Sequence, residues 1–299
     1  LAPKALDRLM FDVDCVKGTQ QEERYTWVPK PEDVGIHPWS LKIFDLDGKL
    51  LAEGSTKLHV YPANAGAGRP LTLLILGDSL TNANVYPTEL YDLCQAEGNP
   101  KLTLLGTNVP NKARPEVRHE GYGGWRAETF CTLWADEIWN QEGRRTRSPF
   151  LFTKGGQPDF KRYCDEQNGG QGPDFVTILL GCNDNFGAKD ETIEASIDTF
   201  EKYMEMLFAQ IHGVRPDTKI GVISLMPPAA TQDAFGANYG CSQTRWQYRK
   251  NQHRVLERSF AKFTNREAEN VYFVPAYVGL DTVNNYPSAK GPANSRADQ

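Results

Sequence analysis

The sequence lacks the features that mark metal-cage, membrane-spanning and nucleic-acid-binding proteins. Its 299 residues hold six cysteines but no CxxC pair, so neither a zinc cage nor a dithiol redox motif is readable. No apolar run approaches the ~20 residues that span a bilayer, and the longest runs, such as 73–76 and 176–180, are only as long as a strand. Thirty-three Lys and Arg against 38 Asp and Glu give a net charge of −5, which argues against nucleic acid as a partner.

The sequence also has no internal repeat, and its composition, 39% hydrophobic and 24% charged, is that of a globular protein. At ~150 residues per domain, the length allows two domains or one large one. The chain begins at Leu1, as a processed or excised chain does, and a secreted or periplasmic location is slightly favoured. In that location the cysteines could form one or two disulfides. The sequence leaves the oligomeric state open.

Residues 1–69 are predicted to form a small β-rich segment. A hairpin turn is expected at Asp47-Gly48, because this dipeptide accepts the positive φ angles of a tight turn. The turn joins the first two of three expected strands, 41–46, 49–52 and 57–61. Residues 62–70, rich in Gly, Ala and Pro, read as a linker. We therefore place a domain boundary near residue 69.

Residues 70–299 are predicted to form an α/β fold, a three-layer α/β/α sandwich with a central, mostly parallel sheet. Apolar runs of strand length alternate with amphipathic stretches, which is typical of a parallel sheet covered on both faces. The expected strands are 71–76, 101–106, 174–180, 218–225 and 270–275. Apolar residues at helical spacing predict covering helices around 193–211 and 248–263. A basic cluster, Arg144, Arg145 and Arg147, is expected in a solvated loop.

The first stretch that holds a candidate catalytic residue is the apolar strand 73–76 together with the turn after it. Gly77 permits an unusual backbone there, and Ser79 opens a helix-like segment. Ligands bind at the carboxyl ends of strands in open parallel sheets, so Ser79 stands where a nucleophile would meet a substrate. Ser and Asp also cap helices, which is the more common role of an isolated Gly-Asp-Ser.

Two further stretches end in polar or glycine-rich turns. Residues 119–126 form a glycine-rich loop that could turn backbone N–H groups toward an anion. It precedes an expected apolar helix that includes Phe130, Leu133, Trp134 and Ile138. The buried strand 175–180 ends near Asn183. Taken singly, the first is an ordinary strand-to-helix turn and the second an ordinary turn residue.

Together, in this order, the three stretches resemble the sequence blocks of the SGNH hydrolases, the GDSL family of esterases and lipases. Residues 77–80 are similar to the first block, the loop around Gly124 to the second, and residues 181–184 to the third. The resemblance covers residues 70 to about 285. A weaker likeness to the carbohydrate-esterase branch rests on three short stretches, 226–228, 238–239 and 280–286.

The resemblance implies acyl transfer without a metal or organic cofactor. Ser79 would attack an ester carbonyl and form an acyl-enzyme. The oxyanion hole would consist of the Ser79 N–H, the Gly124 N–H and the Asn183 side-chain amide. Gly suits its position because a bare backbone can approach the substrate closely.

Four more residues are assigned to substrate binding. Tyr122 and Trp125 could offer a flat apolar wall to a sugar ring, although packing is an equally ordinary role. His119 would line the pocket or fix the loop, and Asp184 adjoins Asn183.

The family's fourth block, an Asp-x-x-His element that supplies the base, is missing. The five histidines are His37, His59, His119, His212 and His253, and none follows residue 253. Asp281 has Asn284 three positions later, and no apolar periodicity predicts a closing helix. We expect a chain that stops before this block. The alternatives are a degenerate binding protein and another histidine as the base, with His119 the one to consider.

The sequence therefore predicts a serine esterase that cleaves an ester, an acetyl ester first of all, from a carbohydrate or another small acylated molecule. Two alternatives stay open, a noncatalytic carbohydrate-binding protein and a lipid or thioester hydrolase. The catalytic His and Asp are unassigned.

Overall fold

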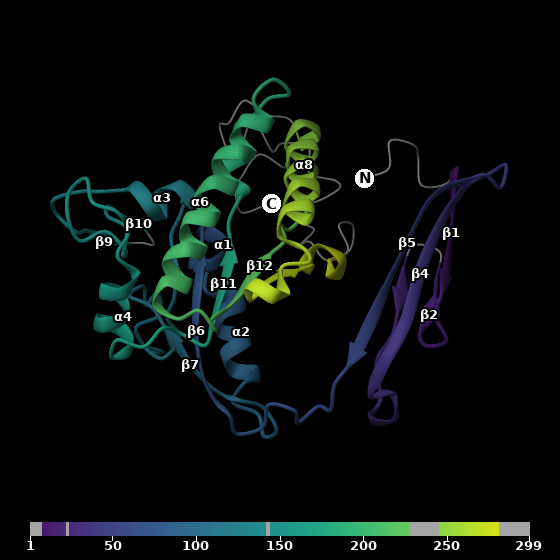
Figure 1. Ribbon diagram of the computed structural model, residues 1–299, viewed down its shortest axis with the longest axis horizontal. Helices are drawn as coiled ribbons and strands as arrows, with labels where there is room; N and C mark the ends of the chain where they lie inside the picture. The colour runs from purple at the N-terminus through teal and green to yellow at the C-terminus, as the bar shows by residue number, and fades with distance from the viewer. Residues whose placement is uncertain (1–7, 22–23, 142–143, 228–244, 281–299) are drawn as a thin grey trace, which may run out of the picture. The chain divides into compact units, whose positions relative to one another are not determined.

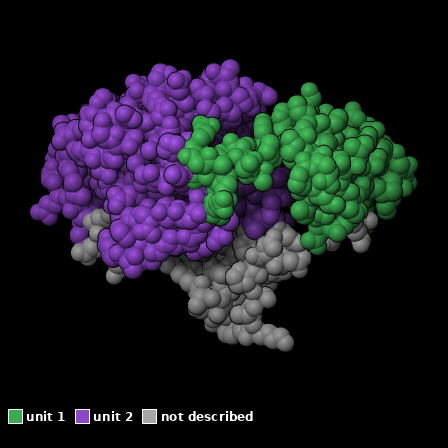
Figure 2. Space-filling model, turned by 90° about the horizontal axis from the view of Figure 1, so that it is seen from below, with its two compact units in different colours: residues 1–69, 96–100 green, residues 70–95, 101–299 purple. Residues whose placement is uncertain are grey.

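The computed structural model describes residues 8–21, 24–141, 144–227 and 245–280 (Figure 1). Contacts divide the chain into two compact units, coloured separately in Figure 2. Unit 1 comprises residues 1–69 and 96–100, and unit 2 comprises residues 70–95 and 101–299. The assignment of the two parts as an N-terminal segment and a hydrolase domain stays a prediction.

Unit 1 is built on an antiparallel sheet of three strands in the order β1-β4-β5. The strands are β1 (Leu9–Asp14), β4 (Gly35–Asp45) and β5 (Leu50–Val60), with a second hairpin of β2 (Thr19–Gln20) and β3 (Tyr25–Thr26) and the short helix η2 (Pro31–Asp33). The turn at Asp47-Gly48 is confirmed: Gly48 has φ +77° and donates its N–H to the Asp45 carbonyl. The separate strand expected at 57–61 is wrong, because these residues continue β5 in register with β4.

Unit 2 contains the predicted parallel sheet, in the order β13-β12-β11-β6-β7, with β8 also paired to β6. Every described pair in it is parallel. Its strands are β6 (Pro70–Gly77), β7 (Lys101–Leu105), β8 (Glu120–Gly121), β11 (Phe175–Leu179), β12 (Lys219–Ile223) and β13 (Val271–Val274). All five expected strands are thus confirmed. Two more short strands, β9 (Asn140–Gln141) and β10 (Arg144–Arg145), form a hairpin.

Helices cover both faces of this sheet because strand residues alternate between them. Leu74 and Leu76 of β6 belong to the larger apolar cluster, which includes α6, whereas Leu73 and Ile75 pack with residues of α2. The helices are α1 (Ser79–Asn82), α2 (Val85–Leu93), α3 (Ala127–Thr132), α4 (Phe160–Asn168), α5 (Cys182–Asn185), α6 (Ile193–Val214), α8 (Arg245–Phe263), η3 (Glu267–Glu269) and η4 (Ala276–Gly279). The three-layer α/β/α prediction is confirmed.

The two long predicted helices are also present, with differences in detail. The apolar stripe of α6 is buried as expected, from Ile193 to Ile211. On α8, Phe260 is 57% exposed and meets Phe273 edge-on instead of entering the core. The helix expected after the glycine-rich loop is shorter than its apolar spacing predicted, because α3 ends at Thr132.

Candidate active site

The three sequence blocks follow three neighbouring strands of the sheet, β8, β6 and β11. Gly77 at the end of β6 pairs with Gly121 of β8 on one side and with Leu179 of β11 on the other. Because the strands are parallel, the turns that follow them meet at the same edge of the sheet. These turns carry Ser79, Gly124 and Asn183.

Ser79 is exposed at the start of α1. The helix cap is its neighbour Asp78, whose Oδ1 accepts a hydrogen bond of 2.9 Å from the Leu80 N–H. The turn requires glycine before it, since a Cβ on Gly77 would lie 1.8 Å from Thr81 Oγ1. Among the described residues, none is hydrogen-bonded to the Ser79 hydroxyl. The capping role therefore belongs to Asp78, and Ser79 is left facing solvent.

Gly124 is exposed and has φ +77°, a conformation that other residues rarely adopt. A Cβ built on it would meet no atom within 4 Å, so the space beside it is open. Its N–H makes no hydrogen bond within the described part of the chain. A ligand could approach this backbone closely.

Asn183 joins the three turns through its side-chain amide. Its Nδ2 donates to Asp78 Oδ2 at 3.2 Å and to the Trp125 carbonyl at 3.0 Å. Asp78 adjoins Ser79, and Trp125 adjoins Gly124. Both amide protons are thus engaged, so an oxyanion would have to share one of them or replace Asp78 as the acceptor.

Two buried carboxyl groups give this edge of the sheet an unusual electrostatic character. Burial raises the pKa of Asp78 to about 6, although the Leu80 N–H partly offsets it. Burial likewise raises the pKa of Asp184 to about 6, against the opposing effects of the Ala127 N–H and the nearby Arg126 guanidinium. Strongly perturbed carboxyl groups at a strand-end cleft are typical of functional sites. No group of three or more potential metal ligands occurs among the described residues.

The structure places the four expected substrate-binding residues in different surroundings. Tyr122 is completely buried and Trp125 is 5% exposed, with their rings 4.3 Å apart in the core. Of the two roles expected for these rings, packing is the one observed. Asp184 is partly exposed beside Asn183.

His119 fixes the glycine-rich loop and is completely buried. Its Nδ1 accepts a hydrogen bond of 3.0 Å from the Gly121 N–H, and its backbone exchanges two hydrogen bonds with Asn108. Burial lowers the pKa of His119 to about 4, so its ring is neutral at pH 7. Its Nε2 has no partner in the described structure, and no hydrogen bond connects it to Ser79.

Sequence reasoning missed a buried network centred on Glu120. This carboxylate accepts hydrogen bonds from the hydroxyls of Tyr122 and Tyr163 and from both the N–H and the hydroxyl of Thr107. Arg145 is correspondingly half-buried and donates to the hydroxyls of Thr107 and Tyr122. The expectation of a solvated arginine cluster is therefore wrong for Arg145. No local pattern could reveal this, because the partners lie up to 43 residues apart in sequence.

No hydrogen bond in the described structure of unit 2 connects His212 or His253 to Ser79. His212 Nε2 lies 3.0 Å from the Thr218 carbonyl oxygen, and the His253 ring lies 6.4 Å from that of Tyr277. His37 and His59 belong to unit 1. Asp281 and Asn284 lie outside the described residues, as do the stretches 238–239 and 281–286 of the carbohydrate-esterase resemblance.

Cys15, Cys94, Cys131, Cys164 and Cys182 are free thiols. In the described part of the chain, no helix combines the length and the apolar character needed to cross a membrane.

No family model matches the sequence, and no curated protein does. Solved structures that resemble the chain include a family 3 carbohydrate esterase of Clostridium thermocellum, at 17% identity over 69% of this chain and 77% of the other, with a TM-score of 0.39. A family 3 carbohydrate esterase from Talaromyces cellulolyticus gives 17% identity, 68% and 77% coverage, and a TM-score of 0.33. An acetyl xylan esterase gives 13% identity over 68% of this chain and 76% of the other, with a TM-score of 0.34. Likenesses this distant leave the activity to be argued from the site itself.

Proposed function

We propose that this protein is a serine ester hydrolase of the SGNH type. One observation carries the proposal: the Asn183 amide is hydrogen-bonded both to Asp78 and to the Trp125 carbonyl, beside an exposed Ser79. This contact gathers a hydroxyl, a free backbone N–H at Gly124 and an amide at one strand-end edge. These are the groups that acyl transfer requires of a nucleophile and an oxyanion hole.

In the proposed reaction, Ser79 Oγ attacks the ester carbonyl and its proton passes to a base. The carbonyl oxygen becomes an oxyanion that accepts hydrogen bonds from the N–H groups of Ser79 and Gly124 and from Asn183 Nδ2. Collapse of this intermediate breaks the ester C–O bond, the leaving oxygen takes up the proton that the base received from Ser79, and the alcohol departs. Water then hydrolyses the acyl group on Ser79, which releases the carboxylic acid and restores the hydroxyl. Loss of one oxyanion donor typically lowers turnover by about 10²–10³.

The proposed substrate is an acetyl ester of a carbohydrate or a similar small polar alcohol. Support comes from the sequence resemblance and from two acidic residues described next to Asn183, Asp78 and Asp184, which do not suit the apolar chain of a lipid.

A second candidate function follows because the catalytic base is unassigned. No histidine described in unit 2 is hydrogen-bonded to Ser79, and oxyanion donors and binding alone can leave about 10³–10⁴ of acceleration over water. A noncatalytic carbohydrate-binding protein would keep the same groups at this edge of the sheet, and it would hydrolyse esters no faster than this residual acceleration allows.

The test compares the chain with two variants, Ser79→Ala and Asn183→Ala, on p-nitrophenyl acetate and on an acetylated xyloside. We expect Ser79→Ala to abolish protein-dependent hydrolysis and to prevent mass-spectrometric detection of an acetyl group on residue 79. Asn183→Ala should lower kcat at least 10-fold, with Asn168→Ala as the control, because Asn168 only bonds to the Gln171 carbonyl. Hydrolysis that survives Ser79→Ala unchanged refutes the proposal.

A further inference from the structure

A small polar pocket opens between the start of α3 and the first half of α6, which lie side by side (Figure 1). Its volume is about 280 Å³, and it is lined by Arg126, Glu128, Asp184, Thr192, Ala195, Ser196 and Thr199. Arg126 is two residues from Gly124, and Asp184 follows Asn183. The pocket therefore begins beside two of the proposed oxyanion donors.

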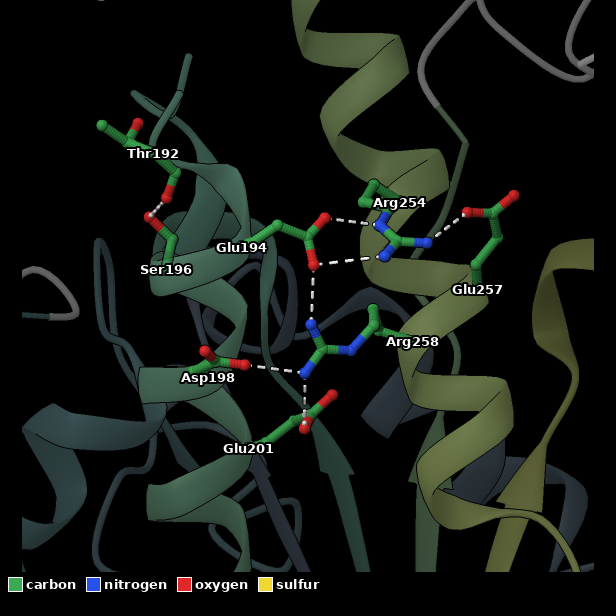
Figure 3. A network of polar contacts seen from close by, with 8 residues as sticks. All are labelled: Thr192, Glu194, Ser196, Asp198, Glu201, Arg254, Glu257 and Arg258. Atoms are coloured by element: carbon green, nitrogen blue, oxygen red, sulfur yellow. Dashed lines mark hydrogen bonds and ion pairs between the residues drawn. The ribbon is translucent and has the colours of Figure 1, made fainter. Parts of the chain in front are cut away.

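Hydrogen-bond acceptors outnumber donors in this pocket. The hydroxyls of Ser196 and Thr199 donate to the carbonyls of Thr192 and Ala195, at 3.0 and 2.9 Å, which leaves their oxygens free to accept. Figure 3 shows Thr192 and Ser196 on the side of α6 turned away from α8. Asp184 accepts one long hydrogen bond, 3.3 Å from the Ala127 N–H, and its other oxygen has no partner among the described residues.

Arg126 is the donor of the set. Its exposed guanidinium makes no hydrogen bond or ion pair within the described chain. A ligand for this pocket must therefore donate several hydrogen bonds to oxygens and accept at least one from a guanidinium. A carboxylate or phosphate can only accept hydrogen bonds, and an ammonium group can only donate them and would leave the Arg126 guanidinium without an acceptor. A group with several hydroxyls does both.

The size and lining of the pocket further restrict the class of ligand. The volume lies just below the ~300–1,000 Å³ of pockets for drug-sized ligands, so the pocket suits one sugar ring better than a chain. No aromatic side chain lines it among the described residues, so recognition relies on hydrogen bonds instead of ring stacking.

We propose that the α3–α6 pocket binds the alcohol part of the ester as a single neutral sugar ring, with Arg126 as the specificity-determining residue. This inference rests on the proposed function, because the sugar's ester group would reach the neighbouring Gly124 and Asn183. Arg126 donates to ring hydroxyl oxygens, and the hydroxyls in turn donate to Asp184, Ser196 and Thr199.

The binding test does not depend on catalysis. Methyl β-D-xylopyranoside is titrated into the chain and into Arg126→Ala, and binding is measured by calorimetry or NMR. A hydrogen bond to a charged group is worth about 1.5–3 kcal/mol, so Arg126→Ala should weaken binding by about 10-fold or more. Arg118→Ala is the matched control, because its guanidinium only bonds to the Pro115 carbonyl. It should bind the xyloside as the unmodified chain does.

The kinetic test uses the ratio of two substrates. Arg126→Ala should lower kcat/KM for a mono-acetylated methyl xyloside about 10-fold more than for p-nitrophenyl acetate, which has no sugar ring. Equal xyloside binding by the chain and Arg126→Ala overturns the inference, as does tighter binding of methyl glucuronide carboxylate than of the neutral xyloside. Hydrolysis that survives Ser79→Ala overturns the proposed function instead, so the two failures are distinguishable.

Discussion

Replacing Asp78 by Asn should stabilise the protein, and the gain should depend on pH. Asp78 is 1% exposed and makes no ion pair with any described residue. Burial raises its pKa from the usual 3.8 to about 6, so the native state holds this proton more tightly than the unfolded chain. Its contribution to stability is therefore greatest below about pH 4 and is lost as pH rises through 6.

The magnitude follows from the pKa change. One pKa unit corresponds to about 1.4 kcal/mol, so ionised Asp78 lowers the free energy of unfolding at pH 8 by about 3 kcal/mol. Asn has the shape of a protonated Asp and carries no charge at any pH. The Asn side chain has only one oxygen to accept the two hydrogen bonds from the Leu80 N–H and the Asn183 amide, which costs about 1 kcal/mol at every pH. At pH 4 Asp78→Asn should therefore be slightly less stable than the unmodified chain, and at pH 8 it should be more stable by about 2 kcal/mol.

Urea unfolding followed by tryptophan fluorescence at pH 4, 5, 6, 7 and 8 measures this difference. Subtracting one protein from the other cancels the titration of His119, whose lowered pKa acts in the opposite direction. A difference that stays within about 1 kcal/mol from pH 4 to pH 8, near the error of the extrapolation, would refute the reasoning.

Asp174→Asn serves as a control, because its effect on the free energy of unfolding should depend on pH in the opposite direction. Burial alone would raise the pKa of Asp174, but hydrogen bonds from Thr72 and the ion pair with Arg215, 2.8 Å away, lower it overall. Its ionised form therefore stabilises the fold, and this contribution is lost as pH falls through the folded pKa. Asp174→Asn should accordingly be less stable than the unmodified chain at pH 8 and approach it at low pH.

Two further predictions concern an ion-pair network and a backbone conformation. Arg258 of α8 bonds to Glu194, Asp198 and Glu201 of α6 (Figure 3), so Arg258→Met should lower stability by about 1–2 kcal/mol at low salt and by less in 1 M NaCl. Urea midpoints at the two salt concentrations measure this, and a salt-independent loss would contradict an electrostatic origin. Gly124→Ala should cost about 1–2 kcal/mol for its positive φ and also reduce ester hydrolysis, since the new methyl enters the open space beside the loop. Gly155→Ala, with φ +68° and equally open surroundings, is the matched control and should cost similar stability while hydrolysis stays unchanged.

The sequence could locate the sheet and the candidate site because both depend on local pattern. Residues 73–76 are apolar at every position and residues 176–180 at every position but Thr177, as is typical of strands buried on both faces, and each run is followed directly by a glycine turn. Once the strands are parallel, these turns meet at one edge whatever the loops between them do. The strand-end rule accounts for the common edge, whereas the choice of Ser79, Gly124 and Asn183 came from the family resemblance of the three blocks.

What the sequence could not predict depends on contacts between distant residues. Residues 121–125 consist of three glycines and two aromatic residues, a composition compatible with a ligand-binding loop or with packing. Tyr122 is buried because its hydroxyl meets Glu120 and Arg145, the second of them 23 residues away. The acceptors of the Asn183 amide are 105 and 58 residues away. Neither periodicity nor turn propensity contains that information.

The stability lost by burying the ionised Asp78 carboxyl group bears on whether this edge of the sheet is a functional site. A residue retained for stability alone should not lower stability at neutral pH, yet Asp78 carries a buried negative charge with no cation beside it among the described residues. Its two hydrogen-bond donors, the Leu80 N–H and the Asn183 amide, hold the start of α1 and orient the amide so that nitrogen, not oxygen, faces the turns of Ser79 and Gly124. An amide held this way can donate to a negatively charged oxygen, whereas a flipped amide would repel it. A local conflict with stability that also orients a side-chain amide donor is typical of functional sites, which supports the proposed role of this edge of the sheet.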